Sequence, residues 1–115
     1  MNDKKLNEIA ELIEKKKINE AQTELSKLGT EFLRNTEYLF LRSKIFYLNK
    51  LYYMALDTLL ITTEFDKKDK VYDLISEIYG ILGNKALSEK VSNQSTRLEA
   101  IKSLKNEVTG ISQKE

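Results

Sequence analysis

The stretch LFLRSKIFYLNKLYYMALDTLLI, residues 39–61, constrains the fold most, because its apolar side chains fall on every side of any helix drawn through it. A helix that is apolar nearly all round is normally buried between neighbours. A transmembrane helix would need about 20 almost uncharged residues. This stretch instead carries four charges, namely Arg42, Lys44, Lys50 and Asp57. The sequence therefore predicts two buried helices joined by a turn near Lys50, rather than a membrane span.

Composition removes several classes of function. The 115 residues include no cysteine and no histidine, so the commonest nucleophile, general base and metal ligands are missing. Nineteen basic and eighteen acidic residues give a net charge of +1, which predicts no electrostatic footprint for nucleic acid. The acidic residues Glu8, Glu11 and Glu14 share a helix with lysines and are typical of a solvated face. We expect a non-enzymatic protein without a metal or cofactor.

The ends of the sequence bear on localisation and on the extent of the domain. The N-terminal residues contain no apolar core of a signal peptide, so we expect a cytoplasmic protein. The length suits one domain, predicted over residues 1–108, followed by a disordered tail over 109–115. The absence of proline and the scarcity of glycine favour an all-α fold.

Periodic apolar residues predict six helices. The expected ranges are 3–16, 18–28, 36–48, 51–64, 69–82 and a last helix that starts near residue 86. Residues 30–34 either extend the second helix or form the connection to the third. The third helix is expected at the centre of the domain. The last helix is either continuous or broken near 92–96, where the sequence SNQSTR is polar on all sides.

Capping residues support these boundaries. Gly29 is expected as a left-handed cap after the second helix, and Gly83 as the end of the fifth. The predicted N-caps are Asp3, then Asn35 or Thr36, then Asp66 or Asp69, and finally Asn84.

Small residues suggest a repeat. Ala21, Ala55 and Ala86 each open the second helix of a pair, and they recur at similar spacing along the chain. Residues 36–69 resemble a tetratricopeptide (TPR) unit, whose period is about 34 residues. The positions that carry the resemblance are Leu39, Ser43, Phe46, Tyr52, Ala55, Leu59 and Thr62. Three positions depart from the motif, with Arg42 at an apolar position, Lys50 at the turn glycine and Lys67 at the common proline. Residues 6–35 and 72–97 match the motif in part.

The resemblance implies about three antiparallel helix pairs stacked as a short TPR-like solenoid with a long C-terminal helix. An ordinary six-helix domain remains the alternative. The family binds protein or peptide partners on the concave face lined by the first helix of each pair. In this sequence that face would carry Lys4, Asn7, Glu11, Phe40, Lys44, Tyr47, Asp73, Glu77 and Ile81. Glu11 and Glu77 replace the amides or cations of the carboxylate clamp found in chaperone-docking members, which argues against that subclass.

The sequence thus predicts a TPR-like helical-repeat adaptor or assembly chaperone that mediates protein–protein interaction. The expected partner-binding residues are Phe40, Lys44, Tyr47 and Ile81, although Phe40 and Tyr47 also suit packing between repeats. A second set lies on the last helix and comprises Leu98, Ile101 and Leu104. That stripe either packs within the chain or docks on another protein, which would make the chain a subunit of a homodimer or a larger complex. No nucleic acid and no membrane is expected as a partner. Arg42 is expected to meet a carboxylate or to reach solvent.

Overall fold

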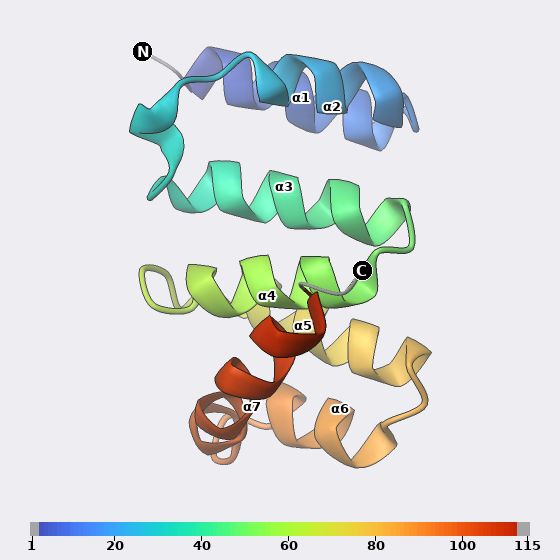
Figure 1. Ribbon diagram of the computed structural model, residues 1–115, viewed down its shortest axis with the longest axis vertical. Helices are drawn as coiled ribbons and strands as arrows, with labels where there is room; N and C mark the ends of the chain where they lie inside the picture. The colour runs from blue at the N-terminus through green and yellow to red at the C-terminus, as the bar shows by residue number, and fades with distance from the viewer. Residues whose placement is uncertain (1–2, 113–115) are drawn as a thin grey trace.

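Helices account for all the regular secondary structure in residues 3–112, the part of the chain that the computed structural model describes (side chains: 4–105) (Figure 1). The elements are α1 (Asp3–Glu14), α2 (Ile18–Ser26), the 3₁₀ helix η1 (Thr30–Phe32), α3 (Thr36–Leu48), α4 (Tyr52–Thr62), α5 (Asp69–Ile81), α6 (Lys85–Ser92) and α7 (Arg97–Ser112). The all-α prediction is therefore confirmed. Three successive pairs, α1–α2, α3–α4 and α5–α6, each form a helical hairpin.

The three hairpin turns have the same geometry. Each turn has one residue in the left-handed region, with φ of 63° at Lys16, 62° at Lys50 and 83° at Gly83. The next residue donates its N–H to the carbonyl five residues earlier. These bonds run from Lys17 to Leu12 (2.8 Å), from Leu51 to Phe46 (2.9 Å) and from Asn84 to Tyr79 (2.9 Å). This hydrogen bond defines the Schellman motif, which ends a helix and reverses the chain. The turns recur at nearly equal intervals along the chain, close to the TPR period of about 34 residues.

The turns also give a common starting point for counting along the second helix of each pair, where a small residue is expected at the crossing with the first helix. The residue five positions after the left-handed one is Ala21, Ala55 and then Ser88. The prediction of Ala86 at the third site is wrong, because Ala86 is exposed. Ser88 takes this place and shares hydrogen bonds with Ser76 of α5, each hydroxyl donating to the other residue's carbonyl at 2.7 and 2.8 Å. A small polar residue is tolerated there because its hydroxyl finds a partner.

Helix α3 lies at the centre, as predicted. Its residues Leu39, Leu41 and Ile45 belong to one apolar cluster with α1, α2 and Phe32. Phe40, Phe46 and Tyr47, on other sides of the same helix, pack against a second cluster formed by α4, α5, α6 and α7. The absence of a polar face on α3 follows from these two sets of contacts. Figure 1 shows α3 between the α1–α2 pair and the α4–α5 layer.

The predicted N-caps are confirmed in two places. The Asn35 side chain accepts the Tyr38 N–H at 2.9 Å, and the Asn84 side chain accepts the Leu87 N–H at 3.1 Å. Asp3 is the first residue of α1, and its side chain lies outside the described part.

The predicted cap of α5 is wrong. Residue Lys68, which has no side-chain capping bond, precedes the helix. The Asp66 carboxylate accepts the Lys68 N–H at 3.0 Å in a local turn, and Asp69 is the first helical residue.

The prediction for Gly29 is also wrong. Its φ is −83°, which is not left-handed, and it precedes η1 instead of closing α2. Residues 30–34 therefore form the connection rather than an extension of α2.

The chain breaks between α6 and α7 within the predicted interval. The Asn93 side chain accepts bonds from the Ser95 N–H and hydroxyl at 2.9 and 2.8 Å, and the Thr96 hydroxyl donates to the Lys90 carbonyl at 2.6 Å. Such local bonds satisfy the chain outside a helix. Arg97 then ties the two helices together, since its side chain donates to the carbonyls of Val91 and Ser92, both at 3.1 Å.

Helix α7 folds back over α6 and α4. Figure 1 shows it crossing the stack obliquely from the α6 end toward α4. It continues to Ser112, so residues 109–112 are helical rather than part of the predicted tail. Residues 113–115 lie outside the described part, and the side chain of Val108 does too. None of the helices described combines the length and apolarity needed to cross a bilayer.

The first prediction concerns the turns. Lys50→Gly should raise the free energy of unfolding by about 0.5 kcal/mol, because removing a left-handed strain of roughly 1 kcal/mol outweighs the extra freedom of glycine in the unfolded chain. Gly83→Ala should lower it by about 1 kcal/mol for the opposite reason. Urea denaturation with unchanged slope measures both. Changes of the same sign in the two variants would contradict the shared turn geometry.

The second prediction concerns Arg97, whose side chain is buried and lies 4.3 Å from the Tyr72 ring centroid. Arg97→Met should destabilise the protein by about 3 kcal/mol, because charge-assisted bonds to two carbonyls and the ring contact are lost. Its partner Asp69 has a side chain 72% exposed, so Asp69→Asn should cost less than about 0.5 kcal/mol. Equal losses in the two urea titrations would show that the ion pair, not the carbonyl contacts, holds α7.

Candidate partner-binding site

Phe40 lies on the side of α3 that faces α5. The Lys70 ammonium of α5 lies 4.6 Å from the Phe40 ring centroid and 2.8 Å from the Glu37 carboxylate of α3. The ring is half-buried and packs against the second apolar cluster. Phe40 therefore already has contacts across the two helices, in line with the packing alternative raised from the sequence.

Tyr47 joins the same two helices further along α3. Its hydroxyl donates a hydrogen bond to the Glu77 carboxylate of α5, and its ring centroid lies 6.0 Å from that of Tyr52. The bond to Glu77, together with partial burial and the negative charge of Glu77, raises the pKa of Tyr47 to about 12. Tyr47 is thus part of the α3–α5 contact.

Lys44 and Ile81 complete the predicted set on this face. Lys44 is half-buried between Phe40 and Tyr47 along α3. Ile81 is 49% exposed at the end of α5. The other residues expected on this face, Lys4, Asn7 and Glu11 of α1 and Asp73 and Glu77 of α5, are exposed. Of the four predicted anchors on this face, Ile81 offers the most apolar surface.

The second predicted set, on α7, is divided between two environments. Ile101 and Leu104 are only 5% and 4% exposed and belong to the apolar cluster of α4, α5 and α6. Leu98 is 57% exposed. The prediction of Ile101 and Leu104 as partner-binding residues is therefore corrected, because their side chains pack within the chain, the other alternative raised from the sequence.

A groove that the sequence did not identify lies between α2 and α4, with α3 as its floor. We call it the α3 groove. It encloses about 430 Å³ and is lined by Gln22, Leu25, Ser26, Tyr38, Arg42, Ile45, Phe46, Asn49, Leu51 and Met54. Arg42, the charge among apolar neighbours in the sequence, lies here. Its guanidinium reaches solvent 5.4 Å from the Phe46 ring centroid, which confirms one of the two outcomes expected for it.

Charged side chains on the described surface form ion pairs. Among the side chains of residues 4–105, no three acidic groups gather closely enough to hold a metal ion. The ion pairs on the surface include Lys5 with Glu24 at 3.3 Å and with Glu8 at 4.0 Å, and Lys105 with Glu64 at 3.1 Å. The Lys27 and Lys5 ammonium groups hold the pKa of Glu24 below its usual value. These pairs are typical of a solvated surface.

Comparisons with protein-family models, with curated proteins and with solved structures gave no significant match to this chain.

The third prediction concerns Tyr47. Since the pKa of Tyr47 is higher in the folded protein than the ordinary value of 10.0, its contribution to stability is complete below pH 10 and is lost as the pH rises through about 12. In an absorbance titration at 295 nm, Tyr47→Phe should remove a tyrosine that ionises near pH 12. Glu77→Gln should instead move that ionisation toward lower pH. A titration of Glu77→Gln identical to that of the parent protein, or the loss in Tyr47→Phe of an ionisation near pH 10 instead, would show that the Tyr47–Glu77 bond is absent in solution.

Proposed function

We propose that this protein is a non-catalytic, TPR-like protein-interaction module, an adaptor or assembly chaperone that holds a peptide or helix of a partner. The observation that carries the proposal is the recurrence of one hairpin turn at nearly equal intervals, with left-handed Lys16, Lys50 and Gly83. This interval matches the period of TPR units, about 34 residues. Such repeats present extended binding surfaces built from stacked helix pairs.

Further support comes from the contact between the helices of each hairpin. The same separation along the chain relates Ile9 to Ala21, Ser43 to Ala55 and Ser76 to Ser88. The first four of these side chains are completely buried, and the last two share hydrogen bonds. A small residue at each crossing allows two helices to approach closely. This shared spacing supports the proposal, because a repeat architecture uses equivalent positions in successive units.

The proposed binding surface is the face shared by α1, α3 and α5. Phe40, Lys44 and Tyr47 line its centre and Ile81 lies at its end. Lys44 and Ile81 are the positions to change, because Phe40 and Tyr47 also support the α3–α5 contact, and truncating them would test stability and binding together. The alternative function is a structural subunit docked through its last helix. Of the three residues predicted to dock, only Leu98 is exposed, since Ile101 and Leu104 are buried within the chain.

The fourth prediction tests this surface with the full chain as bait. Affinity capture from the native cell, quantified by mass spectrometry, should recover a partner protein with the parent chain. The double variant Lys44→Glu with Ile81→Ser should recover at least fivefold less of it, because the charge is reversed and the apolar anchor is lost.

Two controls accompany the capture. Lys85→Glu, at an exposed position at the start of α6, makes the same charge change away from this face and should capture as well as the parent. Circular dichroism should show equal helicity in all three chains. Equal capture by the double variant and by the parent would refute this surface, and the absence of any captured protein would refute the adaptor function.

A further inference from the structure

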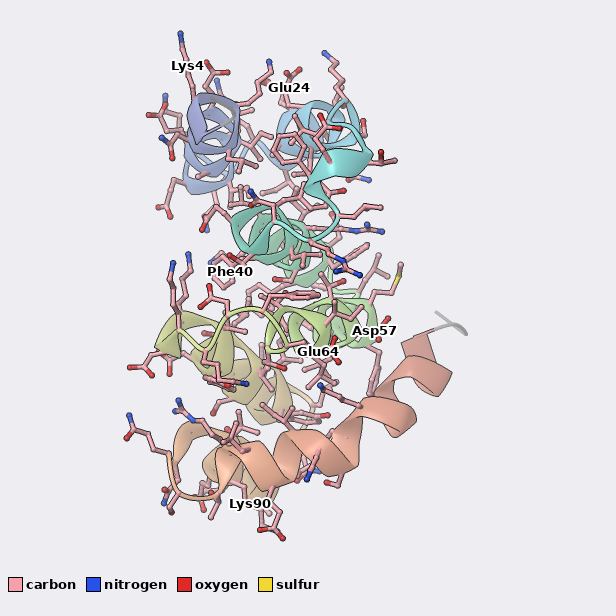
Figure 2. All side chains as sticks on the ribbon, turned by 90° about the vertical axis from the view of Figure 1, so that its left-hand side faces the viewer. Lys4, Glu24, Phe40, Asp57, Glu64 and Lys90 are labelled. Carbon is pink, nitrogen blue, oxygen red and sulfur yellow. The ribbon has the colours of Figure 1, made fainter. Side chains whose placement is uncertain are left out.

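We propose that the α3 groove is a docking site for an amphipathic helix of a partner protein that presents a carboxylate to Arg42. This inference goes beyond the proposed function, because the groove lies on the side of α3 formed with α2 and α4. The face shared by α1, α3 and α5 is on the other side of the stack. Figure 2 shows Phe40 on one side of the molecule, and Asp57 on the opposite side, toward which α7 extends.

The repeated turns set the correspondence between the grooves of successive hairpins, because each left-handed residue marks the same place in its hairpin. Each residue of the α3 groove is matched with the residue at the same distance from the left-handed residue of the next hairpin. Ser26 then corresponds to Leu60, Arg42 to Ile75 and Met54 to Leu87. The three counterparts outline a second groove between α4 and α6, with α5 as its floor, which we call the α5 groove.

In this structure α7 fills the α5 groove. Leu87, the counterpart of Met54, lines a small cavity together with Ala100 of α7. At the other end, the Arg97 guanidinium lies over the Tyr72 ring of α5, and Ile101 lies close to the same tyrosine. The groove that this architecture forms between neighbouring hairpins therefore accepts an α-helix.

Burial differs between the two grooves at two of the three corresponding pairs, whereas Met54 and Leu87 are both half-buried. Leu60 and Ile75 are 2% and 0% exposed in the α5 groove. Their counterparts Ser26 and Arg42 are exposed in the α3 groove. No described segment of the chain covers the α3 groove as α7 covers the α5 groove.

The composition of the α3 groove defines the chemistry of its occupant. Phe46, Leu51 and Met54 are half-buried and supply an apolar lining that suits the apolar stripe of an amphipathic helix, whereas Leu25 and Ile45 of the same lining are already buried in the core. Arg42 is the single charged residue in that lining, and within residues 4–105 it has a ring contact but no ion pair. A helix laid over Arg42 would bury an unpaired charge, at a cost of several kcal/mol, unless it brought a carboxylate. Charge complementarity therefore selects an acidic helix rather than a purely apolar one.

The fifth prediction uses a helix that already fits a groove of this shape. The probe is a stapled peptide of residues 97–108 with Arg97→Glu and Lys105→Glu, which places one carboxylate at the N-terminal end of its apolar stripe and one along the edge of that stripe. The matched peptide keeps Arg97 and Lys105. The full chain carries ¹³C-methyl methionine, and because Met54 is one of only two methionines, its methyl resonance reports on the α3 groove directly.

The acidic peptide should shift the Met54 methyl resonance and bind about tenfold more tightly than the basic peptide, as expected for a partly desolvated charge pair. Arg42→Glu should reverse this preference. Arg34→Glu makes the same charge change outside the groove lining, where Arg34 lies 5.8 Å from the Phe65 ring centroid, and it should leave the preference unchanged. Salt at about 1 M should reduce the tenfold difference.

A second variant tests the groove without altering charge. Ser26→Trp should fill the space and weaken the acidic peptide at least tenfold, with little effect on folding because Ser26 is exposed. Should this variant unfold, Arg42→Glu still decides the question. Lys44→Glu with Ile81→Ser should leave peptide binding unchanged, so the failure of the proposed concave face and the failure of this site are separable.

Four results would overturn the proposal. The first is a Met54 methyl resonance that does not shift, and the second is a peptide affinity that does not depend on the sign of the charge at residue 42. The third is undiminished binding of the acidic peptide to Ser26→Trp, and the fourth is self-association of the parent chain that Ser26→Trp abolishes. The last result would assign the groove to a second copy of this chain.

Discussion

The position of α3 between two apolar clusters is the constraint on which the rest of the structure depends. Leu39, Leu41 and Ile45 pack with the α1–α2 pair, whereas Phe40 and Phe46 pack with the helices that follow. Burial of apolar surface contributes roughly 25 cal/mol per Å² to folding. A helix that contributes to both clusters couples them, so neither half of the molecule reaches its full burial without the other.

The repeated turn determines how the remaining helices are placed. Each hairpin closes with one left-handed residue and the same hydrogen bond. Under the proposal of a docking groove, this shared turn implies that successive hairpins form similar grooves on the side of the second helices. The chain has its own helix for one of these grooves, since Arg97 fixes the start of α7 against α6 and the Tyr72 ring. The α3 groove has no such cover among the described residues.

The two proposed surfaces differ in their physical character. On the α1–α3–α5 face the aromatic side chains already contact α5, through Phe40 with Lys70 and Tyr47 with Glu77. A partner there would contact a surface that is organised before binding, which limits the entropy lost on association. In the α3 groove, Arg42 and Ser26 are exposed, and a partner would supply the burial that α7 supplies one hairpin further on.

The sequence alone predicts the all-α fold, the central place of α3 and the cap Asn84, because these depend on local periodicity and on side chains that bond to nearby backbone. It leaves open whether the last helix breaks near 92–96 and whether Asn35 or Thr36 caps α3. It also singled out Arg42, since a charge within an apolar stretch needs an explanation. The sequence gives no sign of Ser88 at the third crossing, because the pattern there is one of alanines. A serine also fits at this crossing, since it is small and its hydroxyl bonds with Ser76. The sequence does not indicate the role of Arg97, because this residue lies in a polar segment. The apolar stripe with Ile101 and Leu104 has the same pattern whether it is buried within the chain or exposed for a partner. Which apolar stripe meets which partner is decided only by tertiary structure, because every amphipathic helix carries the same pattern whether its cover comes from its own chain or from another.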